Sequence, residues 1–183
     1  MNAVLSARSH ARIVLLTSVL AVLSTGCAGP GAVSQAPQPD GPGKYLINPA
    51  GTMPIYERWH YAQAARVGQT IWVSGQVGAR PDATTIEAQT EIAFERLKAA
   101  LEAAGSSLED IVELTSYHTN MADFPKAAAV KDRFIPRHYP AWTAVGTTGL
   151  VMPSALIEIK AVAVVGSGKR VAVVGEMPVD TAP

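Results

Sequence analysis

The chain has 183 residues, the length of one globular domain with additional segments at its ends. Hydrophobic residues make up 48% and charged residues 16%, which supplies one apolar core and excludes an intrinsically disordered chain. The formal net charge is zero. Removing Arg8 and Arg12 with an expected leader leaves 13 basic residues (15 − 2) against 15 acidic ones, a net of −2. Nucleic-acid binding requires a basic face, so nucleic acid is not an expected partner.

Residues 1–26 have the pattern of an export signal. Arg8 and Arg12 form a basic region, and the apolar run 13–23 is shorter than the roughly 20 residues that span a bilayer. The sequence Leu-Ser-Thr-Gly before Cys27 resembles the bacterial lipobox, in which the cysteine is lipidated and becomes the new N-terminus. We therefore expect an exported, membrane-anchored lipoprotein on the periplasmic side. An ordinary cleaved signal with an incidental cysteine is the alternative.

Two further features bear on this anchor. Cys27 is the only cysteine, so an internal disulfide is excluded. Ala28 follows it, and by resemblance to lipoproteins of hosts with two membranes, a residue other than aspartate there implies sorting to the outer membrane. Residues 27–43 then form an expected tether, because proline and glycine with few large apolar residues cannot build a core.

A globular domain is expected over residues 44–168, with a tail over 169–183. Two helices are predicted by apolar residues at helical spacing, the first over 86–104 and the second from Asp123 to about residue 135, before Pro136. Stretches rich in β-branched and aromatic residues predict strands, with a two-residue turn at 68–69. The predicted strands are 44–48, 61–67, 70–77, 111–119, 142–148 and 156–165, and 171–174 is a candidate for one more. The fold class is α+β, with two helices on one face of a sheet.

The remaining local patterns carry little chemistry. Gly166 to Lys169 lacks the spacing of a phosphate-binding loop, so a turn is expected there. The histidines His60, His118 and His138 have no metal-ligand spacing, and neither a metal nor a cofactor is expected.

Seven short motifs follow one another along the chain. They are Tyr61-x-Gln63, Ser74-Gly75-Gln76, Ala103-Ala104-Gly105, Ile111-Val112, Asp123-Phe124, Pro140-Ala141 and Ile157-Glu158-Ile159. In this order and spacing they resemble the Rid (reactive intermediate deaminase, YjgF-type) family over about residues 55–165. The resemblance implies a chorismate-mutase-like fold with a mixed sheet, a homotrimer, and ligand clefts between neighbouring subunits. It also implies hydrolysis of reactive imines and enamines to keto acids and ammonia.

Three positions match the cleft of that family. By resemblance, Tyr61 and Ser74 line the cleft and Glu158 helps to position the attacking water. A carboxylate can orient water and accept its proton, and a phenol and a hydroxyl can donate to developing polar groups. Each also has a structural alternative: Tyr61 packed at an interface, Ser74 bound to backbone, and Glu158 exposed to solvent. Glu158 stands between Ile157 and Ile159 and must point away from them.

The chain departs from the family at the position of its substrate-clamping arginine, which follows Pro-Ala and is here Trp142. Tryptophan offers one N–H and an apolar ring and cannot replace a bidentate guanidinium. A cleft asparagine is replaced by Ala128, and a small thiol by Ala144. Other cations could restore the clamp, and the candidates are Arg66, Arg80 and Arg137.

Three hypotheses follow. In the first, a divergent hydrolase uses Glu158 to position water beside an aromatic pocket shaped by Trp142, on a C=N compound that needs no carboxylate. In the second, a non-catalytic trimer binds an apolar or cationic small molecule against Trp142 at the membrane surface. In the third, the fold serves a structural role and Trp142 closes the cleft.

Overall fold

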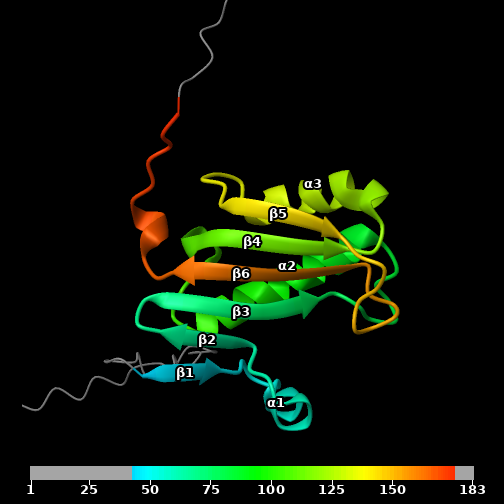
Figure 1. The fold of residues 1–183 in the computed structure, drawn as a ribbon, viewed down its shortest axis with the longest axis horizontal. Coiled ribbons are helices and arrows are strands. Elements are labelled where there is room, and N and C mark those ends of the chain that lie inside the picture. Colours follow the sequence, from blue (N-terminus) through cyan, green and yellow to red (C-terminus); the bar gives the residue numbers. More distant parts are fainter. Residues whose placement is uncertain (1–42, 176–183) are drawn as a thin grey trace, which may run out of the picture. The chain divides into compact units, whose positions relative to one another are not determined.

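The computed structural model describes residues 43–175. The expected signal (1–26), lipidated Cys27 and nearly all of the tether lie outside the described residues, as does the end of the tail. Six strands form one mixed sheet in the order β1-β2-β3-β6-β4-β5 (Figure 1). The strands are β1 (Lys44–Ile47), β2 (Ala64–Val67), β3 (Thr70–Val77), β4 (Ile111–His118), β5 (Ala141–Gly146) and β6 (Ile157–Val164). Only β4 and β5 pair in parallel within this sheet.

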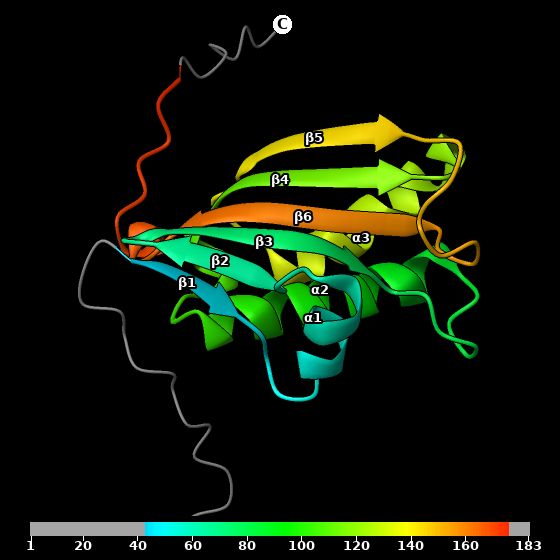
Figure 2. The ribbon, with the colours of Figure 1, turned by 60° about the horizontal axis from the view of Figure 1, so that its bottom comes forward.

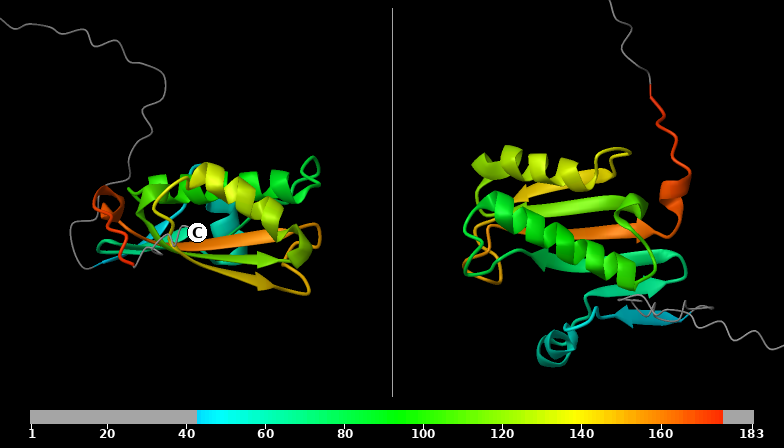
Figure 3. Two further views of the ribbon diagram at one scale, coloured as in Figure 1. Left: turned by 90° about the horizontal axis from the view of Figure 1, so that it is seen from above. Right: turned by 180° about the vertical axis from the view of Figure 1, so that it is seen from behind.

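Two long helices, α2 (Ile86–Ala103) and α3 (Phe124–Phe134), cover one face of the sheet (Figure 3). The α2 helix packs on β3 and β6 and also against α3. Its N-cap is Thr85, whose hydroxyl accepts from the Ala88 N–H at 3.2 Å, and Gly105 beyond its end takes a φ of 79°. The core between helix and sheet includes the fully buried Phe94 and Leu97.

Strand alternation divides β6 between the two faces of the sheet. Ile157 and Ile159 are buried under the helices, whereas Glu158 and Lys160 point to the opposite face. Among residues 43–175 no helix lies over that opposite face, which we call the open face (Figure 3). Trp72 on β3, also on the open face, is 47% exposed.

The predicted α+β class, mixed sheet and strand order along the chain are confirmed. The turn at 68–69 is also confirmed, and β2 is shorter than predicted because it begins at Ala64. Asp123 occupies the N-cap position of α3 but makes no capping bond, since its carboxylate accepts instead from Asn120 and Lys126. The candidate strand over 171–174 is wrong, because this segment has no strand pairing and Val174 is 95% exposed.

A third helix, α1 (Met53–Trp59), was not predicted. It follows β1 and lies at the end of the sheet formed by β1 and β2 (Figure 2). Pro54 stands in its first turn, where a missing N–H costs nothing, and His60 ends it in the left-handed conformation. None of its residues is buried, so the apolar periodicity that reveals other helices is absent from its sequence.

Candidate functional site

Glu158 lies on the open face, at the point where β3 carries a glycine. A Cβ placed on Gly75 would stand 1.8 Å from Oε1 of Glu158 and 2.6 Å from its Cδ, so only glycine leaves room for this carboxylate. Glu158 is half-buried, and within residues 43–175 no hydrogen bond or ion pair engages its carboxylate. The glycine of the Ser-Gly-Gln motif therefore leaves the space that an unpaired carboxylate occupies, and we call this space the glycine seat.

Ser74 lies beside this seat at an irregularity of the sheet. The register between β3 and β6 shifts between Val73 and Gln76, as a β-bulge does. The Ser74 hydroxyl donates to the carbonyl of Ala62 at 2.7 Å, and its backbone N–H donates to the carbonyl of Gln63 at 3.0 Å. Ser74 therefore holds the 61–63 segment against β3, and its oxygen remains available as an acceptor.

Tyr61 stands at the edge of the same region. Its side chain is 42% exposed, and its hydroxyl has no partner among the described residues. It lines a cavity of about 350 Å³ together with Ser74 and Lys160. It also lines a second cavity, of about 340 Å³, together with Gly75. Gly75 adjoins all three predicted residues, because Ser74 precedes it, Tyr61 lines a cavity with it and Glu158 lies against it, although Glu158 lines neither cavity. We call these four residues the glycine-seat cluster.

Trp142 is not part of this cluster. It pairs with Leu114 of β4, and because paired residues of neighbouring strands share a face, its side chain points to the helix face, as Leu114 does. Its indole N–H donates to the Ser116 hydroxyl at 3.0 Å, and its ring lies 5.1 Å from that of Phe124 in α3. Within one chain, Trp142 and Glu158 therefore lie on opposite faces of the sheet.

A cation that no sequence pattern indicated lies against Trp142. The Lys131 ammonium stands 5.0 Å from the Trp142 ring centre, 4.8 Å from that of Tyr139, and 2.6 Å from a carboxylate oxygen of Asp132. Lys131 is only 7% exposed. One signal could have found it: it lies one helical turn after Ala128, a position assigned to the cleft by resemblance.

A buried histidine shares a hydrogen-bonding partner with Trp142. His118 is fully buried, and its Nε2 lies 2.9 Å from the Ser116 hydroxyl that also accepts from Trp142. Its Nδ1 is buried without a partner among the described residues. Burial lowers the pKa of His118 below its ordinary value, so the neutral ring is favoured.

The three arginines considered as substitutes for the clamp each have partners in their own chain. Arg66 is buried and donates to the Ala104 carbonyl at 2.6 Å. Arg80 pairs with Asp82 at 2.8 Å and Arg137 with Glu109 at 3.2 Å, both at the surface. Ala144 follows Trp142 on the helix face, level with Ser116.

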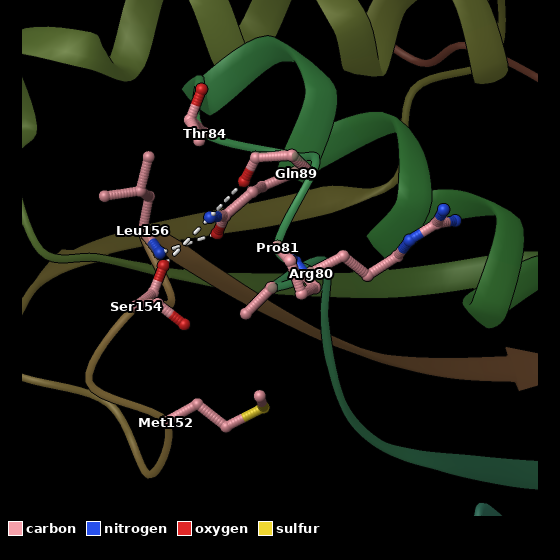
Figure 4. Close-up of a pocket in the computed structure, with 9 residues that line it drawn as sticks. Arg80, Pro81, Thr84, Gln89, Met152, Ser154 and Leu156 are labelled. Carbon is pink, nitrogen blue, oxygen red and sulfur yellow. Dashed lines mark hydrogen bonds between the residues drawn. The ribbon is translucent and has the colours of Figure 1, made fainter.

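A roomier cavity, about 480 Å³, is lined by Arg80, one of the candidate clamp arginines, but not by Tyr61, Ser74, Trp142 or Glu158 (Figure 4). Gln89 at its wall is buried, and its amide nitrogen donates to the carbonyls of Ala83 and Ser154. Its amide oxygen accepts from the N–H of Leu156 at 2.8 Å. Because its polar groups bind loop backbone on both sides, Gln89 joins two loops, and the cavity offers mainly apolar wall.

The described part of the chain contains neither a metal-binding cluster nor a membrane-spanning helix. No group of three or more histidine, cysteine, aspartate or glutamate side chains in residues 43–175 is placed to hold a metal ion. No helix in the same range is long and apolar enough to cross a membrane.

The sequence motifs, the mixed sheet and the glycine-seat cluster together point to one protein family, which comparison with known proteins identifies. The sequence model of the family described as Endoribonuclease L-PSP matches residues 54–165, and the chain belongs to this family, also called YjgF, Rid or RutC. It is 41% identical over 109 residues to the RutC family protein YjgH of Escherichia coli K12, covering 57% of this chain and 83% of that protein.

Two further comparisons agree. A 2-iminobutanoate/2-iminopropanoate deaminase of Dermatophagoides farinae is 30% identical over 129 residues, covering 68% of this chain and 98% of that protein. The solved structure of Protein YJGH superposes with a TM-score of 0.60 at 38% identity, over 67% of this chain and 96% of that one. The family resemblance stated from the motifs is therefore confirmed.

Proposed function

We propose that this protein is a hydrolytic deaminase of imine- or enamine-type compounds, acting in a cleft between copies of the chain. The observation that carries the proposal is the unpaired, half-buried carboxylate of Glu158, held over Gly75, which follows Ser74 in the chain and lines a cavity with Tyr61. A half-buried carboxylate without a protein partner is costly unless it serves a ligand or water. The relative from Dermatophagoides, named as an imine deaminase, supports the same chemistry.

The reaction needs only water and these residues. Glu158 orients a water molecule and takes one of its protons while the water oxygen bonds to the carbon of the C=N group. The nitrogen takes that proton from Glu158, which gives a carbinolamine. The carbinolamine hydroxyl then gives its proton to the nitrogen through Glu158 as the C–N bond breaks, so the carbon becomes a carbonyl and the nitrogen leaves as ammonia. An enamine reaches the same path once protonation at carbon converts it to the imine. The Tyr61 hydroxyl is available to donate to the developing polar groups.

Two copies are needed to bring Trp142 near Glu158. The two side chains lie on opposite faces of one sheet, so a cleft containing both must form between subunits. The open face favours such an assembly, because Leu46, Trp72 and Val145 expose apolar surface on it. We propose the homotrimer that the family resemblance implies.

The substrate proposed here does not depend on a carboxylate bound at position 142. Trp142 uses its N–H on Ser116, and the nearby Lys131 charge is balanced by Asp132. Neither group offers the bidentate clamp of an arginine. The side chains around Lys131 on this side are aromatic, since Trp142 packs on Phe124 and Tyr139 lies against the ammonium, and such surroundings suit an imine with an apolar or aromatic substituent.

The test is ammonia release by the purified full chain. Imines are generated in situ by an amine oxidase from an aromatic amine, and by an amino-acid oxidase to give 2-iminopropanoate. We expect turnover of the aromatic imine above the uncatalysed rate and its loss in Glu158→Gln. The matched control is Glu113→Gln, an exposed carboxylate of β4 whose partner in the sheet is Val162. Full activity in Glu158→Gln, or equal loss in the control, would reject the role of Glu158.

The proposal of an intersubunit cleft has its own test. Mixed oligomers of Glu158→Gln and Trp142→Ala chains should regain part of the activity, because some clefts then combine the intact face of each parent. If every cleft lies within one chain, mixing restores nothing. Sedimentation of the unmixed chain checks the trimer.

A second candidate function is a non-catalytic ligand-binding or structural trimer module at the membrane surface. The packing of Trp142 favours it, because its ring is already in contact with Phe124 and with the Lys131 ammonium. A cationic ligand at Trp142 would have to displace Lys131. Absence of turnover on every imine, together with an intact trimer, would favour this candidate.

We also propose that the protein is exported and anchored through a lipid on Cys27, with residues 28–43 as tether. The support is the basic region, short apolar run and lipobox-like sequence before this cysteine. Cys27→Ser should abolish incorporation of radiolabelled palmitate and release the protein from the membrane fraction. Unchanged labelling would reject the anchor.

A further inference from the structure

The cavity that Tyr61 and Gly75 share with α1 and α2 has two polar groups, Gln63 and Arg96, that the proposed deaminase does not use. Its wall includes Thr52 and Ile55 at the start of α1, Gln63 and Gln76 from the sheet side, and Arg96 of α2, and its volume is about 340 Å³. That volume falls at the lower end of the range for small-molecule sites. We call it the α1 cavity.

Gln63 supplies a buried donor without an acceptor. Its side chain is 6% exposed, and its Oε1 accepts from Gln76 at 3.3 Å. Gln76 Nε2 also donates to the carbonyl of Ser74 at 3.0 Å, so Gln76 presents its nitrogen, the facing Gln63 atom is the oxygen, and Gln63 Nε2 is the free end. Nε2 is buried and has no hydrogen-bond partner within residues 43–175. A buried donor left without an acceptor destabilises the protein, and an incoming acceptor would recover that cost.

Arg96 supplies a cation without an acidic partner. Its Nη1 donates to the backbone carbonyl of Val77 at 2.5 Å, which fixes the guanidinium at the cavity. No carboxylate pairs with it in the described part of the chain, unlike Lys98 on the same helix, which pairs with Glu102. One of its five N–H groups is used, and the others remain available to a ligand.

Apart from the Tyr61 hydroxyl, the rest of the wall is apolar or small, formed by Pro49, Ala50, Ile55, Gly75, Val77, Ala99 and Ala100. One guanidinium and one neutral amide donor match the two oxygens of a carboxylate, and the apolar wall matches a short hydrocarbon tail. We propose that the α1 cavity binds a small monocarboxylate, held by Arg96 and Gln63. Tyr61 and Gly75 of the glycine-seat cluster line this cavity but Glu158 does not, and the proposal does not rest on the proposed deaminase.

The test titrates the full chain with sodium butanoate, followed by calorimetry and by nuclear magnetic resonance of the side-chain amides. We expect saturable binding, shifts of the Gln63 amide signals, and binding about tenfold or more weaker for the neutral butanamide. Raising the salt concentration should weaken butanoate binding, because Arg96 is exposed.

Variants show whether butanoate binds through Arg96 or only through the net charge of the protein. Arg96→Gln should weaken butanoate binding about tenfold or more, whereas Lys98→Gln, which removes the same charge from the same helix, should leave it unchanged. Glu158→Gln should also leave it unchanged, so failure of the deaminase proposal would not affect this one. Thermal unfolding by circular dichroism confirms that each variant is folded. Equal binding by Arg96→Gln, equal binding of butanamide, or unmoved Gln63 signals would overturn the proposal.

Discussion

Replacing Gly75 with alanine tests the glycine seat most directly. The added Cβ would stand 1.8 Å from Oε1 of Glu158, 2.6 Å from Cδ and 2.9 Å from Cγ. Ordinary contact begins at 3.4 Å, so the carboxylate oxygen has to move by about 1.6 Å (3.4 − 1.8). The backbone itself tolerates alanine, because Gly75 does not have a positive φ.

The magnitudes separate stability from activity. Turning Glu158 away from its present rotamer costs about 0.5–1.5 kcal/mol. Replacing glycine by alanine at a compatible backbone position stabilises the protein by about 0.4–1 kcal/mol, because it reduces the conformational entropy of the unfolded chain. The free energy of unfolding should therefore change by less than about 1 kcal/mol. A displacement of more than 1 Å at a reacting group can cost about 100-fold in rate.

We therefore expect Gly75→Ala to keep its melting temperature within a few degrees and to lose about 100-fold in kcat/KM for imine hydrolysis. Gly149→Ala is the matched control, because no atom lies within 4 Å of its added Cβ and its φ is not positive. Ammonia release and thermal unfolding are measured on both variants. If Gly75→Ala retains wild-type kcat/KM, the present position of Glu158 is not the catalytic one and the reasoning fails.

Three further outcomes are expected. Burial opposes ionisation of Asp110, but hydrogen bonds, the strongest from the Gly168 N–H, outweigh it and hold its pKa below the ordinary value. Its stabilisation is thus present at neutral pH and lost as pH falls through the folded-state pKa. Urea unfolding should show that Asp110→Asn lowers the free energy of unfolding by about 1.5–3 kcal/mol at pH 7. The difference from wild type should disappear well below about pH 4. Burial lowers the pKa of His118, so on acidification the unfolded chain takes up the proton first and the free energy of unfolding falls as pH drops below about 6.5. His118→Gln should flatten the dependence of the free energy of unfolding on pH in that range. Trp142→Phe removes the donor to Ser116 and should cost about 1 kcal/mol, an effect that disappears in a Ser116→Ala background.

Alternation along strands explains what the sequence could predict about the site. The isoleucines that flank Glu158 required its carboxylate to point away from the core, and the structure confirms this. The same pattern placed Trp142 and Ala144 on one face together, but it could not say which. Their strand is partly exposed on both sides, so neither face shows a run of large buried residues.

Other features depend on contacts that no local pattern records. From the sequence alone, Lys131 is indistinguishable from an ordinary solvent-facing lysine of α3. It is buried because Tyr139, beyond the helix, and Trp142, on β5, lie against its ammonium. Gln63 reads as a half-exposed strand residue. It is nevertheless buried, with Gln76 of β3 bonded to its side chain and residues of α1 and α2 lining the same cavity.

The position of Lys131 decides what restoring arginine at position 142 would do. An arginine there would place a guanidinium where the indole now lies, about 5 Å from the Lys131 ammonium. At an effective dielectric constant of about 20, two such charges repel by about 3 kcal/mol, and Asp132 can balance only one of them. Trp142→Arg alone should therefore be poorly ordered and inactive on 2-iminopropanoate. Combined with Lys131→Met it should be stable. Gain of turnover only in that double variant would show that the cation beside the cleft has moved from position 142 of β5 to Lys131 of α3 in this protein. Equal activity in the single variant would mean that Lys131 does not lie beside the cleft.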